Sequence, residues 1–163
     1  MNGNRNDMAW KVLKRDIVFQ DTWVQLEASR CELPDGRIIT GKTSGTLGAA
    51  AALLLNALKA LGNIDDQFEL ISKQVLEPVC HLKTTYLDHR NPRLHTDEGL
   101  LTLAISALTN PLADLAKRQL PGLRDSEAHF SVIISEEDLK IFKRLGVRVS
   151  CEPKYETKRL YHR

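Results

Sequence analysis

Strands that alternate with helices along most of the chain predict an α/β domain. A continuous apolar run at residues 49–55 indicates a helix that is apolar around most of its circumference. Short β-forming stretches lie on either side of it, at residues 37–40 and 68–71, and two more lie at residues 129–134 and 147–151. Because this alternation favours parallel strands with covered faces, we predict a three-layer fold with a mixed, mostly parallel sheet and helices on both faces.

The N-terminal part of the chain predicts a β-hairpin rather than a helix. Apolar and β-forming residues are spread from Trp10 to Leu33, with a break at Asp21. The following Pro34-Asp35-Gly36 is typical of a turn, because proline fixes φ and Asp-Gly tolerates positive φ. We therefore divide the chain into a hairpin segment, residues 1–34, and an α/β domain, residues 35–163.

The first two helices are predicted from apolar spacing and capping residues. The first covers residues 44–61 and ends at Gly62. The second begins after the N-cap candidate Ser72, and Pro78 must lie in its first turn or kink it.

Three further helices are predicted downstream. Thr96 is expected to cap the first of them, with two acids in its first turn. A shorter helix covers residues 112–120, and the last begins at Ser135, where Asp138 completes a capping box, and ends at Gly146. For the helix that follows Thr96, the expected buried side consists of Leu100, Leu101, Leu103, Ala104, Ile105 and Leu108.

Size and composition favour one soluble cytoplasmic protein. The chain has 163 residues, of which 42% are hydrophobic and 27% are charged, as in ordinary globular domains. Its formal charge is only +2, so we expect no general affinity for nucleic acid or for membrane surfaces. The N-terminus lacks the apolar core of a secretory signal, and no apolar run is long enough to span a bilayer.

The three cysteines, Cys31, Cys80 and Cys151, favour reduced thiols over a disulfide framework. Their number is odd and they form no C-x-x-C pair. Cys151 ends a predicted strand, where a thiolate paired with a histidine would be a nucleophile. The alternative that we favour is a buried, inert cysteine.

Five ordered stretches of sequence resemble one bacterial family. They are Asp35-Gly36-Arg37-Ile38-Ile39-Thr40-Gly41-Lys42-Thr43-Ser44, Ala52-Leu53-Leu54-Leu55-Asn56-Ala57-Leu58-Lys59, Asn91-Pro92-Arg93-Leu94-His95-Thr96-Asp97-Glu98, Ser126-Glu127-Ala128-His129 and Cys151-Glu152-Pro153-Lys154-Tyr155. Together they resemble the C-terminal region of the family known as domain of unknown function 1846 (DUF1846). Members of that family are longer and have further domains ahead of this region. The resemblance covers nearly all of residues 35–163 and implies a fold but no established activity.

Residues 9–36 look like the opening hairpin of a Nudix hydrolase of the ADP-ribose pyrophosphatase type. Nudix catalysis needs clustered glutamates on one helix to hold the divalent metals that activate water. No such glutamate box follows in the sequence. We therefore predict no Nudix activity and place a join between two kinds of sequence near residues 33–36.

The string from Gly36 to Thr43 satisfies the pattern of a phosphate-binding loop. In such a loop, backbone amides and the lysine hold phosphates and the threonine binds magnesium. The intervening Arg-Ile-Ile-Thr favours an extended strand instead, because β-branched residues resist a tight loop. Nucleotide binding through this string remains an alternative, as does a simpler anion site in which Lys42, Thr43 and Ser44 precede a helix.

A second set of candidate site residues lies at the ends of predicted elements. Arg93 and His95 precede a helix whose first turn carries Asp97 and Glu98, and this combination suits proton transfer. Glu127 and His129 offer the same chemistry before a strand, and ends of elements are where α/β folds place their sites. We predict His95, Asp97, Glu98 and His129 as catalytic residues, and Lys42, Thr43, Ser44, Arg93 and Glu127 as ligand-binding residues.

Other interpretations of these residues stay open. Convergence of His95 and His129 on one carboxylate would create a zinc or manganese site, although our prediction includes no metal and leaves the cofactor unknown. Asp97 and Glu98 would also stabilise a helix start without any ligand.

Three function hypotheses follow. The first is a domain that binds or transforms a small anionic or phosphorylated molecule near these residues. The second is a non-catalytic domain that serves assembly within a longer protein, and the third is nucleotide binding through the string from Gly36 to Thr43. Because a short member of a longer family would expose apolar surface, we also expect self-association.

Overall fold

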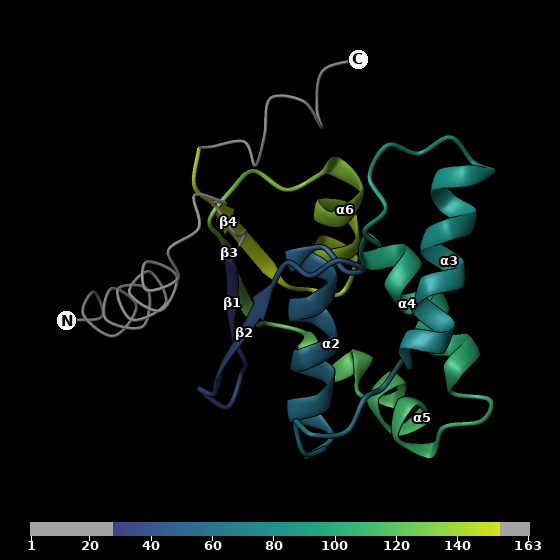
Figure 1. Cartoon of the computed structure of the whole chain (residues 1–163). Coiled ribbons are helices and arrows are strands. Elements are labelled where there is room, and N and C mark those ends of the chain that lie inside the picture. Colours follow the sequence, from purple (N-terminus) through teal and green to yellow (C-terminus); the bar gives the residue numbers. More distant parts are fainter. Residues whose placement is uncertain (1–27, 154–163) are drawn as a thin grey trace, which may run out of the picture.

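A computed structural model describes residues 28–153, a four-stranded sheet with helices packed beside it (Figure 1). Residues 1–27, which make up most of the predicted hairpin segment and of the Nudix-like stretch, lie outside the described residues. In chain order, the elements are β1 (Ala28–Glu32), β2 (Ile38–Lys42), α2 (Ala49–Leu61), α3 (Lys73–Thr85), α4 (Thr96–Ser106), α5 (Pro111–Arg118), the 3₁₀ helix η1 (Leu120–Leu123), β3 (Glu127–Phe130), α6 (Glu136–Arg144) and β4 (Arg148–Cys151).

The sheet has the strand order β2-β1-β3-β4 and is mostly antiparallel. The α/β class is confirmed, but the prediction of a mostly parallel sheet is wrong. The turn with Gly36 at φ +86° folds β2 back antiparallel to β1, and β1 is also antiparallel to β3. Only β3 and β4 are parallel, because α6 carries the chain back between them. The three-layer arrangement is not confirmed, since the described helices lie on one side of the sheet in Figure 1.

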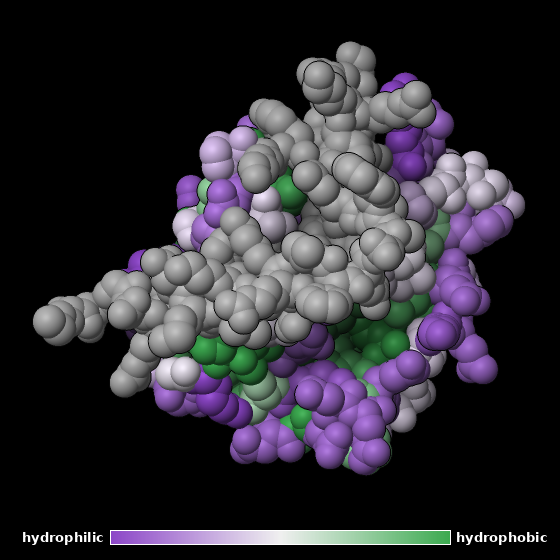
Figure 2. Space-filling model, turned by 60° about the vertical axis from the view of Figure 1, so that its left-hand side comes forward, coloured by the Kyte–Doolittle hydropathy of each residue, from purple (hydrophilic) through white to green (hydrophobic). Residues whose placement is uncertain are grey.

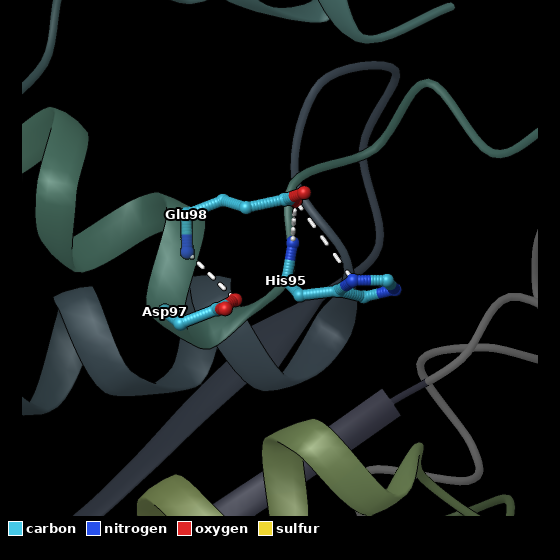
Figure 3. A group of neighbouring side chains, drawn as sticks. All are labelled: His95, Asp97 and Glu98. Carbon is cyan, nitrogen blue, oxygen red and sulfur yellow. Dashed lines mark hydrogen bonds and ion pairs between the residues drawn. The ribbon is translucent and has the colours of Figure 1, made fainter. Parts of the chain in front are cut away.

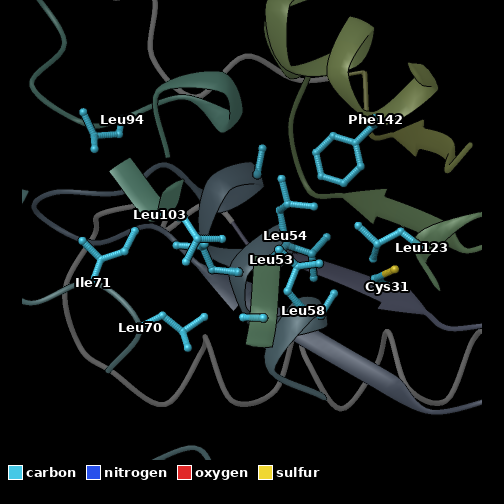
Figure 4. Packing of buried hydrophobic residues seen from close by; sticks show 14 of the residues in the cluster. Cys31, Leu53, Leu54, Leu58, Leu70, Ile71, Leu94, Leu103, Leu123 and Phe142 are labelled. Carbon is cyan, nitrogen blue, oxygen red and sulfur yellow. The ribbon is translucent and has the colours of Figure 1, made fainter. Parts of the chain in front are cut away.

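Helix α2 forms the centre of the core, as its apolar sequence predicts. Leu53 and Leu58 have no exposed surface, and residues of the other helices and the sheet pack around them (Figure 4). The helix lies so close to β2 that a Cβ on Gly41 would be 2.5 Å from the backbone nitrogen of Leu53. Ser29 strengthens this contact, because its hydroxyl lies 3.1 Å from the carbonyl oxygens of both Gly41 and Ala49. Gly41 therefore has a packing role.

Several predicted element boundaries need correction. Residues 68–71 do not form a strand, although Leu70 and Ile71 are buried there. Pro78 lies at the sixth position of α3, beyond the first turn, and the N-cap of α4 is His95 rather than Thr96. In place of the single predicted helix 112–120, the chain forms α5 and then η1, which contains the proline-glycine pair at residues 121–122. Ser135 does cap α6, since its hydroxyl accepts from the Asp138 N–H at 3.1 Å.

The predicted buried side of α4 is wrong for most of its residues. Leu103 is buried, but Leu101, Ile105 and Leu108 are 67%, 62% and 83% exposed. The side that faces α2 consists largely of small or polar residues. A Cβ on Gly99 would lie 3.6 Å from the Ala51 side chain, so the helices approach too closely for leucines at this contact.

The visible surface of the described residues is largely hydrophilic. In the view of Figure 2, hydrophilic residues form most of the described surface, with smaller apolar patches between them. Within residues 28–153, no helix combines the length and the apolar character needed to cross a bilayer.

Candidate functional site

The start of α4 gathers three of the predicted catalytic residues, His95, Asp97 and Glu98 (Figure 3). The Glu98 carboxylate reaches back and accepts the backbone N–H of His95 at 2.8 Å, as the third residue of a capping box does. Asp97 accepts the backbone N–H of Glu98 at 2.8 Å. The His95 ring extends away from the helix, and its Nδ1 lies 3.8 Å from a Glu98 oxygen. All three side chains therefore surround one helix start.

A buried lysine that we did not predict completes this cluster. Lys83 of α3 is only 3% exposed. Its ammonium group donates to Glu98 Oε2 at 2.8 Å and to the backbone carbonyl of Arg93 at 2.6 Å. Burial raises the pKa of the Glu98 carboxyl, but Lys83 and the His95 N–H outweigh this effect, so the pKa lies below its ordinary value of 4.5. Glu98 and Lys83 thus form an ion pair that joins α3 to α4.

The same geometry decides between a metal ion and an ion pair. Ligand atoms of His95, Asp97 and Glu98 lie within 4.8 Å of one another, the single such group of three or more in residues 28–153. A divalent cation bound there would lie next to the ammonium group of Lys83, which already occupies the carboxylate oxygen of Glu98. Since like charges repel, the position of the Lys83 ammonium group favours the ion pair over a metal.

A second contact, made by Asp138 of α6, also fixes the start of α4. Asp138 of α6 is 6% exposed, and one of its oxygens accepts both the backbone N–H and the hydroxyl of Thr96 at 2.8 Å. A carboxylate at a helix N-terminus satisfies amides that the helix leaves unpaired and opposes the helix dipole. Sequence reasoning assigned Asp138 to the start of its own helix, and no local signal pointed to α4.

The loop before α2 lies beside the loop before α4. Leu47 and Leu94 form a parallel β-bridge, with hydrogen bonds from Leu94 N to Thr46 O at 2.9 Å and from Gly48 N to Leu94 O at 3.1 Å. This contact brings the segment after Lys42, Thr43 and Ser44 next to the segment that contains Arg93 and His95. These two stretches are therefore neighbours at the level of the backbone.

The phosphate-loop interpretation is overturned at this point. Ile38–Lys42 is a β-strand, so the backbone is extended where a phosphate requires a loop. Ser44 is the residue that turns the chain, since its hydroxyl accepts the backbone N–H groups of Thr46 at 3.3 Å and Leu47 at 3.0 Å. Gly41 is explained by its contact with α2, and Lys42 is exposed at the end of the strand.

Comparisons with known proteins identify the family of the chain. The model of the family described as "Domain of unknown function DUF1846, C-terminal" matches residues 14–161. The chain belongs to the DUF1846 family. It is 50% identical over 136 residues to a UPF0371 protein of Corynebacterium efficiens, which covers 83% of this chain and 28% of that protein. UPF0371 proteins of Corynebacterium glutamicum and Streptococcus pyogenes serotype M3 are 48% and 44% identical over 132 residues, covering 81% of this chain and 27% of each. The chain thus spans less than a third of the length of these relatives.

The family match extends ahead of the boundary that we predicted at residue 35. It begins at residue 14 and includes most of the stretch that resembles a Nudix hairpin. In the structure, β1 lies before residue 35 and pairs with both β2 and β3. The division into two segments stays a prediction, as does the Nudix likeness.

A cleft of about 530 Å³ opens in the DUF1846 domain between the Ser44 loop, α2 and the start of α3. Its lining residues are Ser44, Gly45, Thr46, Leu47, Ala52, Leu55, Asn56, Lys59, Glu69, Leu70, Ile71, Lys73, Leu76 and Glu77. Apolar side chains form much of its wall, and two lysines and two glutamates contribute charges. Ser44 is the one predicted site residue that lines it. A second hollow of about 680 Å³ beside β2 shares Asn56 and Lys59 with the cleft.

The remaining predicted residues lie on β3 and have partners on or next to β4. Nδ1 of His129 is 2.7 Å from the Ser150 hydroxyl, and its Nε2 is 3.6 Å from a Glu152 oxygen. Glu127 accepts from Arg148 at 2.6 Å. His129 is not part of the metal-competent group at the start of α4. The geometry therefore divides the predicted residues between two places.

The three cysteines are free thiols. Burial raises the pKa of Cys31 to about 11, so this thiol stays protonated and unreactive at neutral pH. Burial also raises the pKa of Cys80. Cys151, at the end of β4, is exposed, so the interpretation of it as a buried residue is wrong.

Proposed function

We propose that the DUF1846 domain binds a small molecule with an anionic group in the cleft beside Ser44. The observation that carries this proposal is the combination of apolar wall and converging polar groups in one concave site of about 530 Å³. Small-molecule sites generally consist of an apolar hollow with a few polar groups that fix the orientation of the ligand. Leu55, Leu70 and Leu76 would pack on the apolar part of the ligand.

Lys73 and Lys59 supply the positive charge that an anionic group needs. Lys73 is exposed at the first position of α3, and Lys59 is largely buried on α2. The Lys59 ammonium donates to the carbonyl of Asp66 at 3.0 Å, which fixes its position. An ammonium group has three donors, so this bond leaves capacity for a ligand oxygen. Glu69 and Glu77 on the same cleft would bind a cationic or hydroxyl group of the same ligand.

A catalytic role for His95, Asp97 and Glu98 has less geometric support. Glu98 is engaged by Lys83 and by the backbone of His95, and Asp97 accepts a backbone N–H of its own helix. These contacts stabilise the helix start, which the same residues would do in a protein without a reaction. We therefore propose binding, with His95 as the residue to test first if turnover is observed.

Thermal-shift measurements on the full chain test the proposal. We would screen phosphometabolites, nucleotides, carboxylates and divalent metals, because a molecule that binds the native state raises its apparent stability. We expect at least one anionic compound to raise the melting temperature, and A52L, which fills the cleft, to abolish that shift.

Two lysine variants show whether the cleft supplies the binding. K73M should weaken binding by roughly tenfold, the effect of losing one charged hydrogen bond. K140M removes an exposed lysine of α6 and serves as the matched control. A shift that survives A52L and K73M would place the ligand elsewhere and refute the cleft.

A second candidate function is assembly without catalysis. The observation that favours it is the apolar, exposed outer side of α4, because large apolar patches on soluble proteins commonly mark contact surfaces.

A further inference from the structure

Helix α4 exposes two of its large apolar residues while it buries several small or polar ones. Its buried side carries Gly99, Thr102 and Ser106 beside Leu103. The hydroxyl of Ser106 is buried without a hydrogen-bond partner in the structure. Its outer side carries Leu101 and Ile105, which are 67% and 62% exposed, and Leu108, in the turn just after the helix, is 83% exposed. A helix of a globular domain normally turns its apolar stripe toward a packed neighbour. The outer side of α4 is therefore the side on which a packing partner is expected.

Helix α3 extends this apolar surface. The Lys83–Glu98 ion pair joins the end of α3 to the start of α4. The opposite ends also meet, because the Asn110 side chain, just after α4, lies 3.3 Å from the carbonyl oxygens of Glu69 and Leu70, just before α3. The two helices are therefore antiparallel neighbours, as Figure 1 also shows.

Exposed apolar residues of α3 lie next to the ion pair. Leu82 precedes Lys83 and is 50% exposed, and Tyr86, which follows at the end of α3, is 73% exposed. On α4, Leu101 lies one turn beyond Glu98. We call the surface formed by Leu82, Tyr86, Leu101, Ile105 and Leu108 the α3–α4 face.

We propose that the α3–α4 face binds the same face of a second copy of this chain. Leu101, Ile105 and Leu108 are spaced by four and then three positions, and Leu108 lies in the turn that directly follows α4, so the stripe extends a similar distance on either side of Ile105. In an antiparallel pair of α4 helices, Leu101 would lie opposite the partner's Leu108, and Ile105 would lie at the two-fold axis. An isologous dimer requires this kind of self-complementary surface.

Charges at the two ends of the face match the same antiparallel arrangement. Asp97 is exposed at the start of α4, and Lys73 is exposed at the start of α3, close to the other end of α4. Antiparallel pairing brings Asp97 toward the partner's Lys73 at both ends of the interface. Such opposite charges favour this register over a parallel one, which would bring like charges together.

Measurement of the molar mass of the full chain by light scattering over a concentration series tests the dimer. We expect the mass to rise from one copy to two. I105D, which introduces a charge at the axis twice per dimer, should raise the dissociation constant by at least about 100-fold. F68D changes an apolar residue of similar type that is 46% exposed outside the face, and it should leave the dimer intact. Circular dichroism must show that both variants fold.

Two further variants test the orientation. D97K and K73E should each weaken the dimer, and the double variant should restore it. I105C in a C151S background should form a disulfide-linked dimer on oxidation, because only an axial position brings one residue close to its own copy.

A wild type that stays monomeric, or a dimer that I105D leaves unchanged, would overturn the proposal. The I105D and F68D results can be separated from the ligand screen, because Ile105 and Phe68 do not line the cleft, whereas Lys73 lies both at the cleft and at the end of the α3–α4 face.

Discussion

Helices α2 and α4 have similar apolar sequences but opposite positions in the molecule. In α2, Leu53, Leu54 and Leu58 are almost completely buried, and residues from several elements pack around them. In α4, Leu101 and Ile105 face outward, and the inner side consists of small and polar residues around a single fully buried leucine, Leu103. The comparison teaches that apolar content predicts a helix, whereas close approach to a neighbour decides which side is buried.

The two helices also differ in how their starts are held. The start of α2 is fixed mainly by backbone contacts, such as the bond from Gly48 to Leu94. The start of α4 is fixed by charged side chains from two other helices, Lys83 and Asp138. Variants that remove either kind of support should therefore have separable effects on stability.

Loss of the buried lysine should have the largest effect. K83M leaves the Glu98 carboxylate partly buried beside an apolar group, and removal of one partner of a buried pair typically costs about 3–5 kcal/mol. Chemical denaturation should show this loss, and K143M on the exposed side of α6 should change the stability by less than about 0.5 kcal/mol. In K83M/E98Q, part of the loss should return. Equal effects of K83M and K143M would contradict the ion pair's role.

A matched pair of leucine variants tests the comparison between the helices directly. L53A removes a side chain with no exposed surface from α2, so we expect a loss of about 2–5 kcal/mol in the free energy of unfolding. L101A removes one that is 67% exposed on α4, and the loss should stay below about 0.5 kcal/mol when the protein is dilute. A large loss for L101A under monomeric conditions would show that the outer side of α4 is covered within the chain.

The sequence predicted the burial and the end of α2, because its apolar run leaves no polar side to choose, but the helix begins at Ala49 and not at residue 44 as predicted. It could not predict the inner side of α4, since Gly99 and Thr102 are buried only because α2 lies against them. The direction of the strands was equally hidden. The antiparallel pairing of β1 with β3 joins residues far apart in the chain, and no local pattern encodes it.

The roles predicted for the candidate site residues stay predictions, but the structure shows which of these residues lie together. His95, Asp97 and Glu98 surround one helix start, and the backbone next to Ser44 lies beside the backbone next to Arg93. Lys83 was missed because a lysine within a helix normally faces solvent. His129 proved to be a partner of Ser150 across two strands, a contact that requires knowledge of the sheet.

Replacement of Gly41 tests the close packing of α2. A Cβ in G41A would lie 2.5 Å from the Leu53 nitrogen, so helix and strand must separate. Such overpacking typically costs about 1–3 kcal/mol. G45A is the control, because a Cβ at Gly45 would meet no atom within 4 Å. If Gly41 instead served a phosphate, G41A would reduce ligand binding and leave the melting temperature unchanged.

The smallest expected effect is a pH dependence that separates a carboxylate paired with a buried lysine, Glu98, from one paired with exposed cations, Asp114. The pKa of Glu98 is lowered in the folded state, so the unfolded chain binds its proton more readily. The stability due to Glu98 is therefore complete above its ordinary value of 4.5 and is lost as the pH falls toward the folded value. E98Q should flatten the rise of unfolding free energy with pH in this range.

Asp114 of α5 provides the contrast that makes this measurement decisive. Hydrogen bonds from Arg118 and Lys117 lower its pKa as well, but this ion pair lies at the surface. Salt screens exposed charges much more than partly buried ones. Added sodium chloride should therefore remove the difference between wild type and D114N while most of the difference between wild type and E98Q persists. If both differences vanish together, the Lys83–Glu98 pair is as open to solvent as a surface pair. The start of α4 would then be less buried than the structure indicates.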